Sequence, residues 1–332
     1  MKPTVRSIAG KIFPAPARTT HELRSQVAAM SERLDTLERT LAYVKDYEYY
    51  KNLHPAQYRR ALEEWYQTHT GRVLDLDNPQ TYCEKMQWLK LYDSTPLKTR
   101  LADKYLVRQW VEEMVGSKYL VPLMGVWNSF NEIDFAALPD QFVLKCTHAS
   151  GFNAIVRGKA SMDLRSMESL FKQWLNINYA FWQGLELHYK DITPRILAEE
   201  YLVNQGTHLH DYRVYCFGGK PEFVQYVTGR ANILPEEAVF DSDWVRQPLL
   251  IFNPPVEGTV PRPERLEELL SVASKLSEDF CAVRVDFYIL DDGSIKFSEM
   301  TFTPLVGVPN FDPPEYDAIL GAKIKLPSAA AL

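Results

Sequence analysis

Hydrophobic residues recur along this chain with two different periods, and each period predicts a different kind of element. Between residues 21 and 49 the apolar positions return every three or four residues, at Leu23, Val27, Met30, Leu34, Leu37, Leu41 and Val44. This heptad spacing predicts a coiled-coil helix that would join copies of the chain into a homo-oligomer or dock a partner. An amphipathic helix packed on its own domain is the alternative interpretation.

Helical periods continue to about residue 116 and then give way to strand-like alternation. Helices are predicted at 54–71, 78–93 and 96–116, with Gly71 ending the first and Asn78 or Thr81 capping the second. The later expected elements are strands at 118–127, 140–159 and 194–203, helices at 163–182 and 263–280, and hairpins at 211–229 and 283–304. Antiparallel hairpins mixed with helices indicate an α+β fold.

Composition and charge exclude several classes of protein. With 332 residues, 46% of them hydrophobic, the chain has the composition of a globular protein. A net charge of −6 and the lack of a basic block argue against a nucleic-acid partner. No run of 18 apolar residues predicts a transmembrane helix, and residues 1–19 lack the apolar centre of a signal peptide.

The cysteines favour a reducing compartment. None of the four forms a CxxC pair, so free thiols are expected. The cytoplasm is therefore the expected location. Lys2, Arg6 and Lys11 would add only a weak attraction to the inner face of the cell membrane.

One apolar hairpin, VRVDFYILDDGSIKFSEMTFTP, carries charged residues on both of its arms. Asp-Gly at 292–293 predicts a two-residue type I′ turn, because that turn needs positive φ at both central positions. With this turn, Asp286 lies opposite Glu299 and Arg284 lies opposite Thr301. Directly opposite residues share a face, with Cβ atoms roughly 4.5–5.5 Å apart.

Two carboxylates facing each other repel unless a cation lies between them. An arginine, a lysine or a divalent metal would serve, and Mg²⁺ prefers oxygen ligands and is often bound together with substrate phosphates. The alternative interpretation is a surface pair, Asp286 and Glu299, neutralised by Arg284 and a nearby lysine.

Two further stretches suggest nucleotide chemistry. Lys145 ends an apolar strand and is followed by a loop of small residues at 148–151, an arrangement that can hold a polyphosphate. Glu199 and Glu200 end another apolar strand, as at a hinge where backbone groups read an adenine ring. A solvated lysine and a pair of exposed acids are the alternatives.

Taken in order, these stretches resemble the TupA-like group of the ATP-grasp superfamily, found among bacterial surface-polysaccharide genes. The similar segments are NPQTYCEKMQWLKLYD, DQFVLKCTHASG, AEEYLV, DYRVYCFGGKPEFVQ and FSEMTFTP. The resemblance covers residues 50–326 and implies an ATP-grasp domain, in which two α+β subdomains grip ATP. Outside it we expect a flexible N-terminus at 1–20, the coiled-coil helix at 21–49 and a flexible tail at 327–332.

The resemblance also implies the residues of a nucleotide site. The implied positions are Lys104, Lys145, His148, Ser150, Gly151, Glu199, Glu200, Leu202, Asp211 and Arg213. The two lysines would hold the α- and β-phosphates. Glu199 and Leu202 would mark the adenine hinge, and Asp211 would contact ribose or substrate. Ala149 and Phe152 stand where the superfamily commonly has glycine, so Phe152 would either restrict the loop or pack on the nucleotide.

Metal and catalytic positions follow from the same resemblance. Asp286, Glu299 and Thr301 are the implied ligands of Mg²⁺ or Mn²⁺, with Thr301 in place of the usual asparagine. Arg284 and Lys145 are implied as catalytic residues, and Arg284 would stabilise the acyl phosphate or the tetrahedral oxyanion.

The implied activity is that of an ATP- and Mg²⁺-dependent carboxylate–amine ligase acting through an acyl phosphate. Its expected partners are ATP, a carboxylate-bearing sugar or polysaccharide acceptor, such as capsular polysaccharide, and an amine donor. A glycosyltransferase of polysaccharide biosynthesis is the first alternative. The second is an ATP-binding scaffold joined to an assembly complex through residues 21–49.

Overall fold

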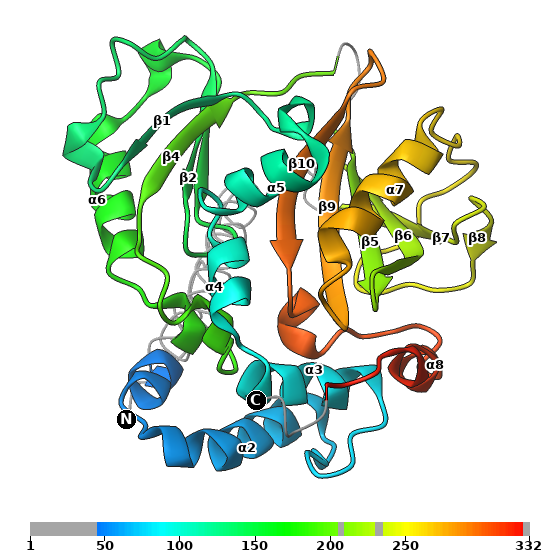
Figure 1. Cartoon of the computed structure of the whole chain (residues 1–332). Coiled ribbons are helices and arrows are strands. Elements are labelled where there is room, and N and C mark those ends of the chain that lie inside the picture. Colours follow the sequence, from blue (N-terminus) through cyan, green and yellow to red (C-terminus); the bar gives the residue numbers. More distant parts are fainter. Residues whose placement is uncertain (1–44, 205–208, 230–234, 328–332) are drawn as a thin grey trace, which may run out of the picture.

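Two antiparallel sheets dominate the computed structural model, which describes residues 45–204, 209–229 and 235–327 (Figure 1). Of the predicted coiled-coil helix only its last residues are described, and residues 45–51 are helical. The predicted N-terminal segment and nearly all of the predicted tail lie outside the described residues. The antiparallel sheets and the helices around them confirm the predicted α+β content.

Between the helical residues 45–51 and the first strand, the chain forms four further α-helices: α2 (Tyr58–Thr70), α3 (Tyr82–Tyr92), α4 (Pro96–Ala102) and α5 (Val107–Val115). Gly71 ends α2 with a left-handed φ of 69°, as predicted. Thr81, rather than Asn78, caps α3, because its hydroxyl accepts the N–H of Glu84 while the Glu84 side chain accepts the N–H of Thr81. The short 3₁₀ helices are η1 (Pro55–Gln57), η2 (Ser117–Tyr119), η3 (Phe130–Glu132), η4 (Lys159–Ser161), η5 (Tyr179–Phe181), η6 (Leu187–Tyr189) and η7 (Pro304–Gly307).

The predicted single helix at 96–116 is wrong, since the chain forms α4 and α5 with a turn between them. Asp103 causes the break, because its carboxylate accepts the backbone N–H groups of Tyr105 and Leu106 and starts a new turn. Lys104 is thereby placed in the turn rather than at the opening of a helix.

The smaller sheet has the order β1-β4-β2-β3, formed by β1 (Leu123–Trp127), β2 (Phe142–Cys146), β3 (Asn153–Val156) and β4 (Ile196–Glu200). One face buries Phe142, Leu144 and Ile196 against Phe171 of α6 (Leu164–Leu175). Because side chains alternate along a strand, Val143, Lys145 and Glu199 lie on the opposite face.

The larger sheet has the order β10-β9-β5-β6-β7-β8. Its strands are β5 (Asp211–Phe217), β6 (Lys220–Thr228), β7 (Glu236–Phe240), β8 (Arg246–Gln247), β9 (Ala282–Ile289) and β10 (Ile295–Thr301). The predicted Gly-Gly turn joins β5 to β6, with Gly218 and Gly219 at φ of 57° and 75°. The sequence patterns had not predicted β7, β8 or the C-terminal helix α8 (Tyr316–Lys323).

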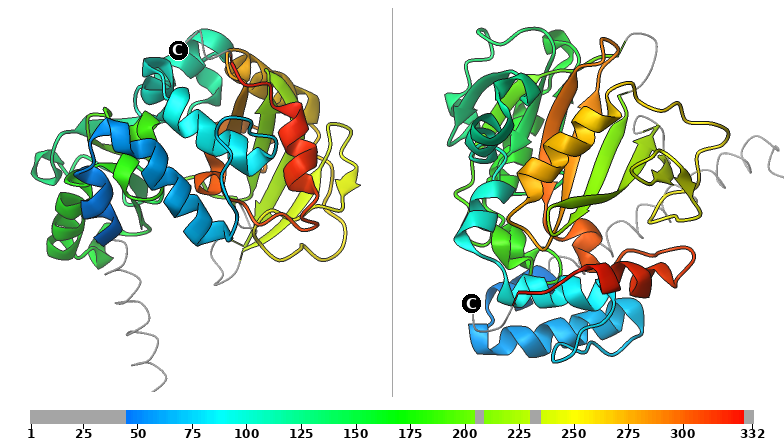
Figure 2. Two further views of the ribbon diagram at one scale, coloured as in Figure 1. Left: turned by 90° about the horizontal axis from the view of Figure 1, so that it is seen from below. Right: turned by 45° about the vertical axis from the view of Figure 1, so that its right-hand side comes forward.

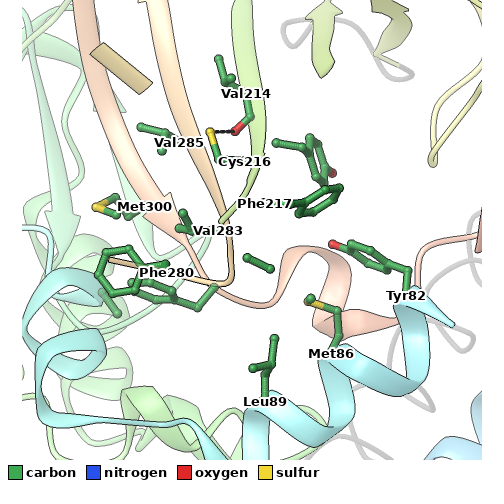
Figure 3. Packing of buried hydrophobic residues seen from close by; sticks show 14 of the residues in the cluster. Tyr82, Met86, Leu89, Val214, Cys216, Phe217, Phe280, Val283, Val285 and Met300 are labelled. Carbon is green, nitrogen blue, oxygen red and sulfur yellow. Dashed lines mark hydrogen bonds between the residues drawn. The ribbon is translucent and has the colours of Figure 1, made fainter. Parts of the chain in front are cut away.

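Helices close one face and the lower end of the larger sheet. Helix α7 (Leu266–Ser277) lies along the face that carries Val214, Val285 and Phe287 (Figure 2). At the lower end, Tyr82, Met86 and Leu89 of α3 point toward the buried residues of β5 and β9 (Figure 3). The other face of the sheet carries the polar side chains of β5, β9 and β10.

The turn of the β9–β10 hairpin differs from the predicted two-residue turn. The N–H of Leu290 donates to the carbonyl of Ser294 at 2.9 Å, and the N–H of Gly293 donates to the carbonyl of Leu290 at 2.8 Å. Gly293 has a φ of 76°. The loop is therefore a three-residue turn with a left-handed glycine at its end.

The predicted pairing of the charged residues is nevertheless correct. Near the turn Ile295 lies opposite Ile289, but an extra residue, Ser298, forms a bulge in β10. After the bulge Glu299 lies opposite Asp286, as predicted. The bulge thus turns the Glu299 side chain away from the α7 face and onto the polar face.

No helix in the described part of the chain is both long enough and apolar enough to cross a membrane.

A histidine is buried below the polar face of the larger sheet. His188 is 2% exposed, and its ring lies against those of Tyr189 and Phe302. Burial, helped by the nearby Lys98 and Lys90, lowers the pKa of His188 to about 3. The imidazole is therefore neutral in the folded chain at neutral pH.

We expect His188 to make the chain less stable as the pH falls from 6.5 toward 3. The unfolded side chain takes up a proton near pH 6.5 and the folded one only near pH 3, so the unfolded state binds more protons in this window. The free energy of unfolding should therefore fall by up to about 1.4 kcal/mol for each pH unit in this window. Urea unfolding of His188→Phe between pH 7.5 and 5 should show a flatter profile than the wild type. The exposed His54→Asn should keep the wild-type slope; equal slopes in all three would contradict the prediction.

Candidate active site

A pocket of about 250 Å³ lies between the polar faces of the two sheets. Its apolar lining comes from Val121, Val143, Ile155, Leu202, Leu209 and Tyr288. Five residues of the predicted nucleotide site also line it: Lys145, Glu199, Glu200, Leu202 and Asp211. Apolar and polar groups contribute about equally to the lining, which suits a flat ring that carries a charged tail.

The carboxylate of Glu199 is engaged by two cations. Lys145 Nζ lies 2.6 Å from its Oε2, and Arg108 Nη1 lies 2.9 Å from its Oε1. Burial alone would lower the pKa of Lys145, but Glu199 and Tyr288 outweigh it, so the pKa is raised and the ammonium stays charged. A ring in this pocket would therefore meet backbone groups at the hinge rather than the Glu199 side chain.

Lys104 connects the loop after β2 to strand β10. Its Nζ donates to the carbonyl of Ala149 at 2.8 Å and lies 3.3 Å from the carboxylate of Glu299. Its backbone N–H donates to the carbonyl of Thr147 at 3.0 Å. Lys104 thus lies where the loop after β2 and the paired acids meet.

The loop itself exposes Ser150 and Gly151, whereas His148 and Ala149 are buried and Phe152 is half-buried. His148 is 2% exposed, and its Nε2 lies 3.1 Å from the carbonyl of Trp174. Burial lowers the pKa of His148, which favours the neutral ring. Phe152 stacks on Trp174 and meets the edge of Tyr179. Phe152 therefore joins the loop to α6 and η5, while contacts of Phe152 or His148 with a nucleotide stay predictions.

Arg284 lies between the facing acids of the β9–β10 hairpin. It donates to both oxygens of Asp286, from Nε at 2.7 Å and from Nη2 at 2.6 Å. The same Nη2 lies 3.1 Å from Thr301 Oγ1 and 3.5 Å from Glu299. Despite its burial, Asp286 holds the pKa of Arg284 well above its ordinary value, so its charge is permanent.

These contacts answer the question of how two carboxylates can face each other. Arg284 neutralises Asp286, and Lys104 neutralises Glu299, which are the partners named in the alternative interpretation. The pair is largely buried rather than on the open surface, since Asp286 is 5% exposed and the Glu299 side chain 25% exposed. Four charged groups therefore gather in a partly enclosed site at the polar face of the larger sheet.

The oxygen donors of the hairpin fit a hard cation that arrives with phosphates. In the part of the chain that the structure describes, no three His, Cys, Asp or Glu side chains gather closely enough to hold a metal alone. Asp286, Glu299 and the hydroxyl of Thr301 offer oxygen only, and each carboxylate oxygen keeps lone pairs beyond those used by Arg284 and Lys104. Mg²⁺ usually takes one or two carboxylates and completes its shell with phosphate and water.

Two arginines present buried N–H groups without a partner among the described residues. The Nε of Arg213 and the Nε of Arg195 are both buried and make no hydrogen bond there. Arg213 lies opposite Asp286 on the neighbouring strand and donates to Asp211 at 3.0 Å. Because unpaired buried donors are rare, each group is a candidate donor to an anionic ligand.

Arg195 and Arg108 were not predicted from the sequence. Arg195 donates to Asp103 at 2.8 Å, across 92 positions of the chain, and Arg108 reaches Glu199 across 91. One local signal was available, since Arg195 precedes Leu197 and Glu199 at alternate positions and so shares the cleft face of β4. Nothing in the pattern of α5 marks Arg108.

A model of the family described as TupA-like ATPgrasp matches residues 84–325. No curated protein matches the chain. Among solved structures, the chain is similar to a D-alanine–D-alanine ligase from Bacillus anthracis complexed with ATP, with 15% identity, a TM-score of 0.39, and coverage of 61% of this chain and 55% of that one.

A biotin carboxylase from Campylobacter jejuni gives 14% identity and a TM-score of 0.40 over 70% of this chain and 48% of that one. An N5-carboxyaminoimidazole synthetase from Staphylococcus aureus complexed with ADP gives 14% identity and a TM-score of 0.39 over 69% of this chain and 53% of that one. The chain thus spans about half the length of these solved structures.

Proposed function

Because the chain belongs to the TupA-like ATP-grasp family, we propose that it is a ligase that uses ATP to join a carboxylate to an amine. The observation that carries the proposal is the meeting of Lys104, Arg284, Asp286 and Glu299 at the polar face of the larger sheet, whose Asp211 and Tyr288 line the pocket between the two sheets. Asp286, Glu299 and Thr301 would hold Mg²⁺, which when bound offsets the charge of the phosphates.

The nucleotide would lie along the cleft between the two sheets. Its adenine would occupy the pocket beside the hinge at 199–202, and Asp211 would contact the ribose. Lys145 would reach the α- and β-phosphates from β2, and Lys104 would reach them from the turn before α5. Both lysines are held in place by protein contacts, so little rearrangement is needed before the phosphates bind.

The proposed chemistry takes place in two steps. An oxygen of the substrate carboxylate attacks the γ-phosphorus, a new P–O bond forms, and ADP leaves. The amine nitrogen then attacks the carbonyl carbon of the acyl phosphate, phosphate leaves with the C–O electron pair, and the amine loses a proton. Arg284 carries a permanent charge beside the reacting groups and would stabilise the oxyanion that develops on that carbon.

The substrates we propose are a carboxylate-bearing sugar of a capsular or other surface polysaccharide and an amine such as an amino acid. This finer proposal is supported by the family resemblance alone. Purified protein incubated with Mg²⁺·ATP can be screened against uronic acids and amines by measuring ADP release. Release that requires both a carboxylate and an amine would support ligation.

Calorimetric titration separates the ligase from a glycosyltransferase. We expect Mg²⁺·ATP to bind and UDP-sugars to give no heat of binding under the same conditions, because the pocket between Val143 and Tyr288 accepts a base whose phosphates then reach two lysines. Apyrase-treated ATP is the control. Binding of a UDP-sugar in preference to ATP would support a glycosyltransferase instead of a ligase. Binding of neither would contradict the proposed nucleotide site.

A further inference from the structure

A strained turn follows directly after the strand that carries Glu299 and Thr301. Leu305, Val306 and Gly307 have φ values of 52°, 56° and 74°, a left-handed conformation that side chains other than glycine rarely adopt. Such a conformation persists only where surrounding contacts hold it. The contacts that hold this turn are therefore candidates for a role in the site.

Helix α3 holds the turn from below. Gln87 Nε2 donates to the carbonyl of Gly307 at 2.9 Å and to that of Val306 at 3.3 Å, while Lys90 Nζ donates to Gln87 Oε1 at 2.8 Å. Gln87 and Lys90 are fully buried. A Cβ on Gly307 would lie 2.6 Å from Gln87 Nε2 and 2.7 Å from Met86 Cβ, so this close approach needs glycine.

A second segment, at 184–186, holds the start of the turn. The hydroxyl of Thr303 donates to the carboxylate of Glu186, which is buried. Gly184, two residues before it, packs so closely on Trp65 that a Cβ would lie 2.9 Å from the indole ring. Lys90 Nζ lies 4.6 Å from the centre of the same ring.

Lys90 and Glu186 are thus two buried ionisable groups, one bonded to Gln87 below Gly307 and the other to Thr303 at the start of the turn. Burial lowers the pKa of Lys90 to about 7 and raises that of Glu186 to about 7, and the charge of each partner opposes the effect on the other. Well-packed apolar residues hold a core at least as firmly as a buried ion pair. Stability alone therefore does not explain why Gln87, Lys90 and Glu186 are polar.

We propose that Gln87, Lys90 and Glu186 are positioning residues that fix the turn at 303–307 and, through it, aim Glu299 and Thr301 at the metal. Only one residue separates Thr303 from Thr301, so a rotation of the backbone at Thr303 reorients the Thr301 hydroxyl. The inference rests on the proposed function. It assigns a role to residues that lie outside the nucleotide pocket.

The test compares ADP affinity with and without Mg²⁺, measured by calorimetry. Thr303→Val removes the donor to Glu186 at constant shape and charge, Gln87→Met removes both bonds to the turn, and Thr303→Ser restores the hydroxyl. We expect the gain in affinity from Mg²⁺ to fall about 10-fold or more in Thr303→Val and Gln87→Met, as for other outer-shell partners of metals. It should return in Thr303→Ser.

Adenosine affinity is the internal control, because the adenine pocket lies at the hinge and should bind equally well in all variants. Leu276→Val, on the buried face of α7, controls for a general loss of stability and should keep the full Mg²⁺ effect. If the wild type binds ADP equally with and without Mg²⁺, the proposed metal site fails and this inference fails with it. If the wild type depends on Mg²⁺ and the folded variants, Thr303→Val or Gln87→Met, keep the whole effect, the positioning role alone is overturned.

Discussion

Asp286→Asn is expected to weaken Mg²⁺·ATP binding by about 100-fold, because Asp286 is a proposed direct ligand and even outer-shell partners of metals cost 10- to 100-fold when they are lost. The amide has nearly the shape of the carboxylate and still accepts one of the two bonds from Arg284, but it carries no charge to hold the cation. Calorimetry with Mg²⁺·ATP and with Mg²⁺-free ATP measures the effect. The loss should be confined to the titration with Mg²⁺.

Asp292→Asn is the matched control, since it makes the same change on the same hairpin at an exposed position in the turn. It should bind Mg²⁺·ATP like the wild type. If Asp286→Asn also binds normally, Asp286 serves only to neutralise Arg284, and the metal would have to be held elsewhere.

Arg284→Met is expected to destabilise the fold by about 3–5 kcal/mol, because it leaves Asp286 buried without its partner. Urea unfolding at neutral pH measures the change. The double variant Arg284→Met with Asp286→Leu should recover most of the lost stability, since it removes both members of the buried pair. Glu299 would keep its contact with Lys104.

Arg60→Met provides the comparison with an exposed ion pair. The Arg60 side chain is 84% exposed and pairs with Glu64 one helical turn away, so its loss should change the stability little. A similar small cost for Arg284→Met would mean that water screens the charges of the hairpin, and the enclosed electrostatics proposed for catalysis would then be wrong.

The sequence predicted the facing acids correctly although it predicted the wrong turn. A two-residue turn and a three-residue turn followed by a bulge both place Asp286 opposite Glu299, so the spacing between them cannot distinguish the two geometries. The apolar spacing in β10 does distinguish them. Ile295, Phe297 and Met300 are buried on the α7 face, and the step of three between the last two shows that one residue is extra.

The sequence patterns could not predict which charged residues pair across the fold. Lys90 and Glu186 belong to segments that look amphipathic or irregular, and only the folded chain brings both against the turn at 303–307. The break between α4 and α5 at Asp103 was not predicted, because its side chain can cap a new turn inside a run of residues that keeps a helical period.

The bulge at Ser298 also affects how the protein avoids aggregation. β10 is the outermost strand of the larger sheet, and an unpaired strand edge is a template on which another chain can add. The bulge interrupts the row of backbone groups on this edge, and Lys296, bonded to the carbonyl of Lys118, ties η2 across the edge. The irregularity that turns Glu299 into the cleft therefore also makes the open edge of the sheet a poor partner for intermolecular β-pairing.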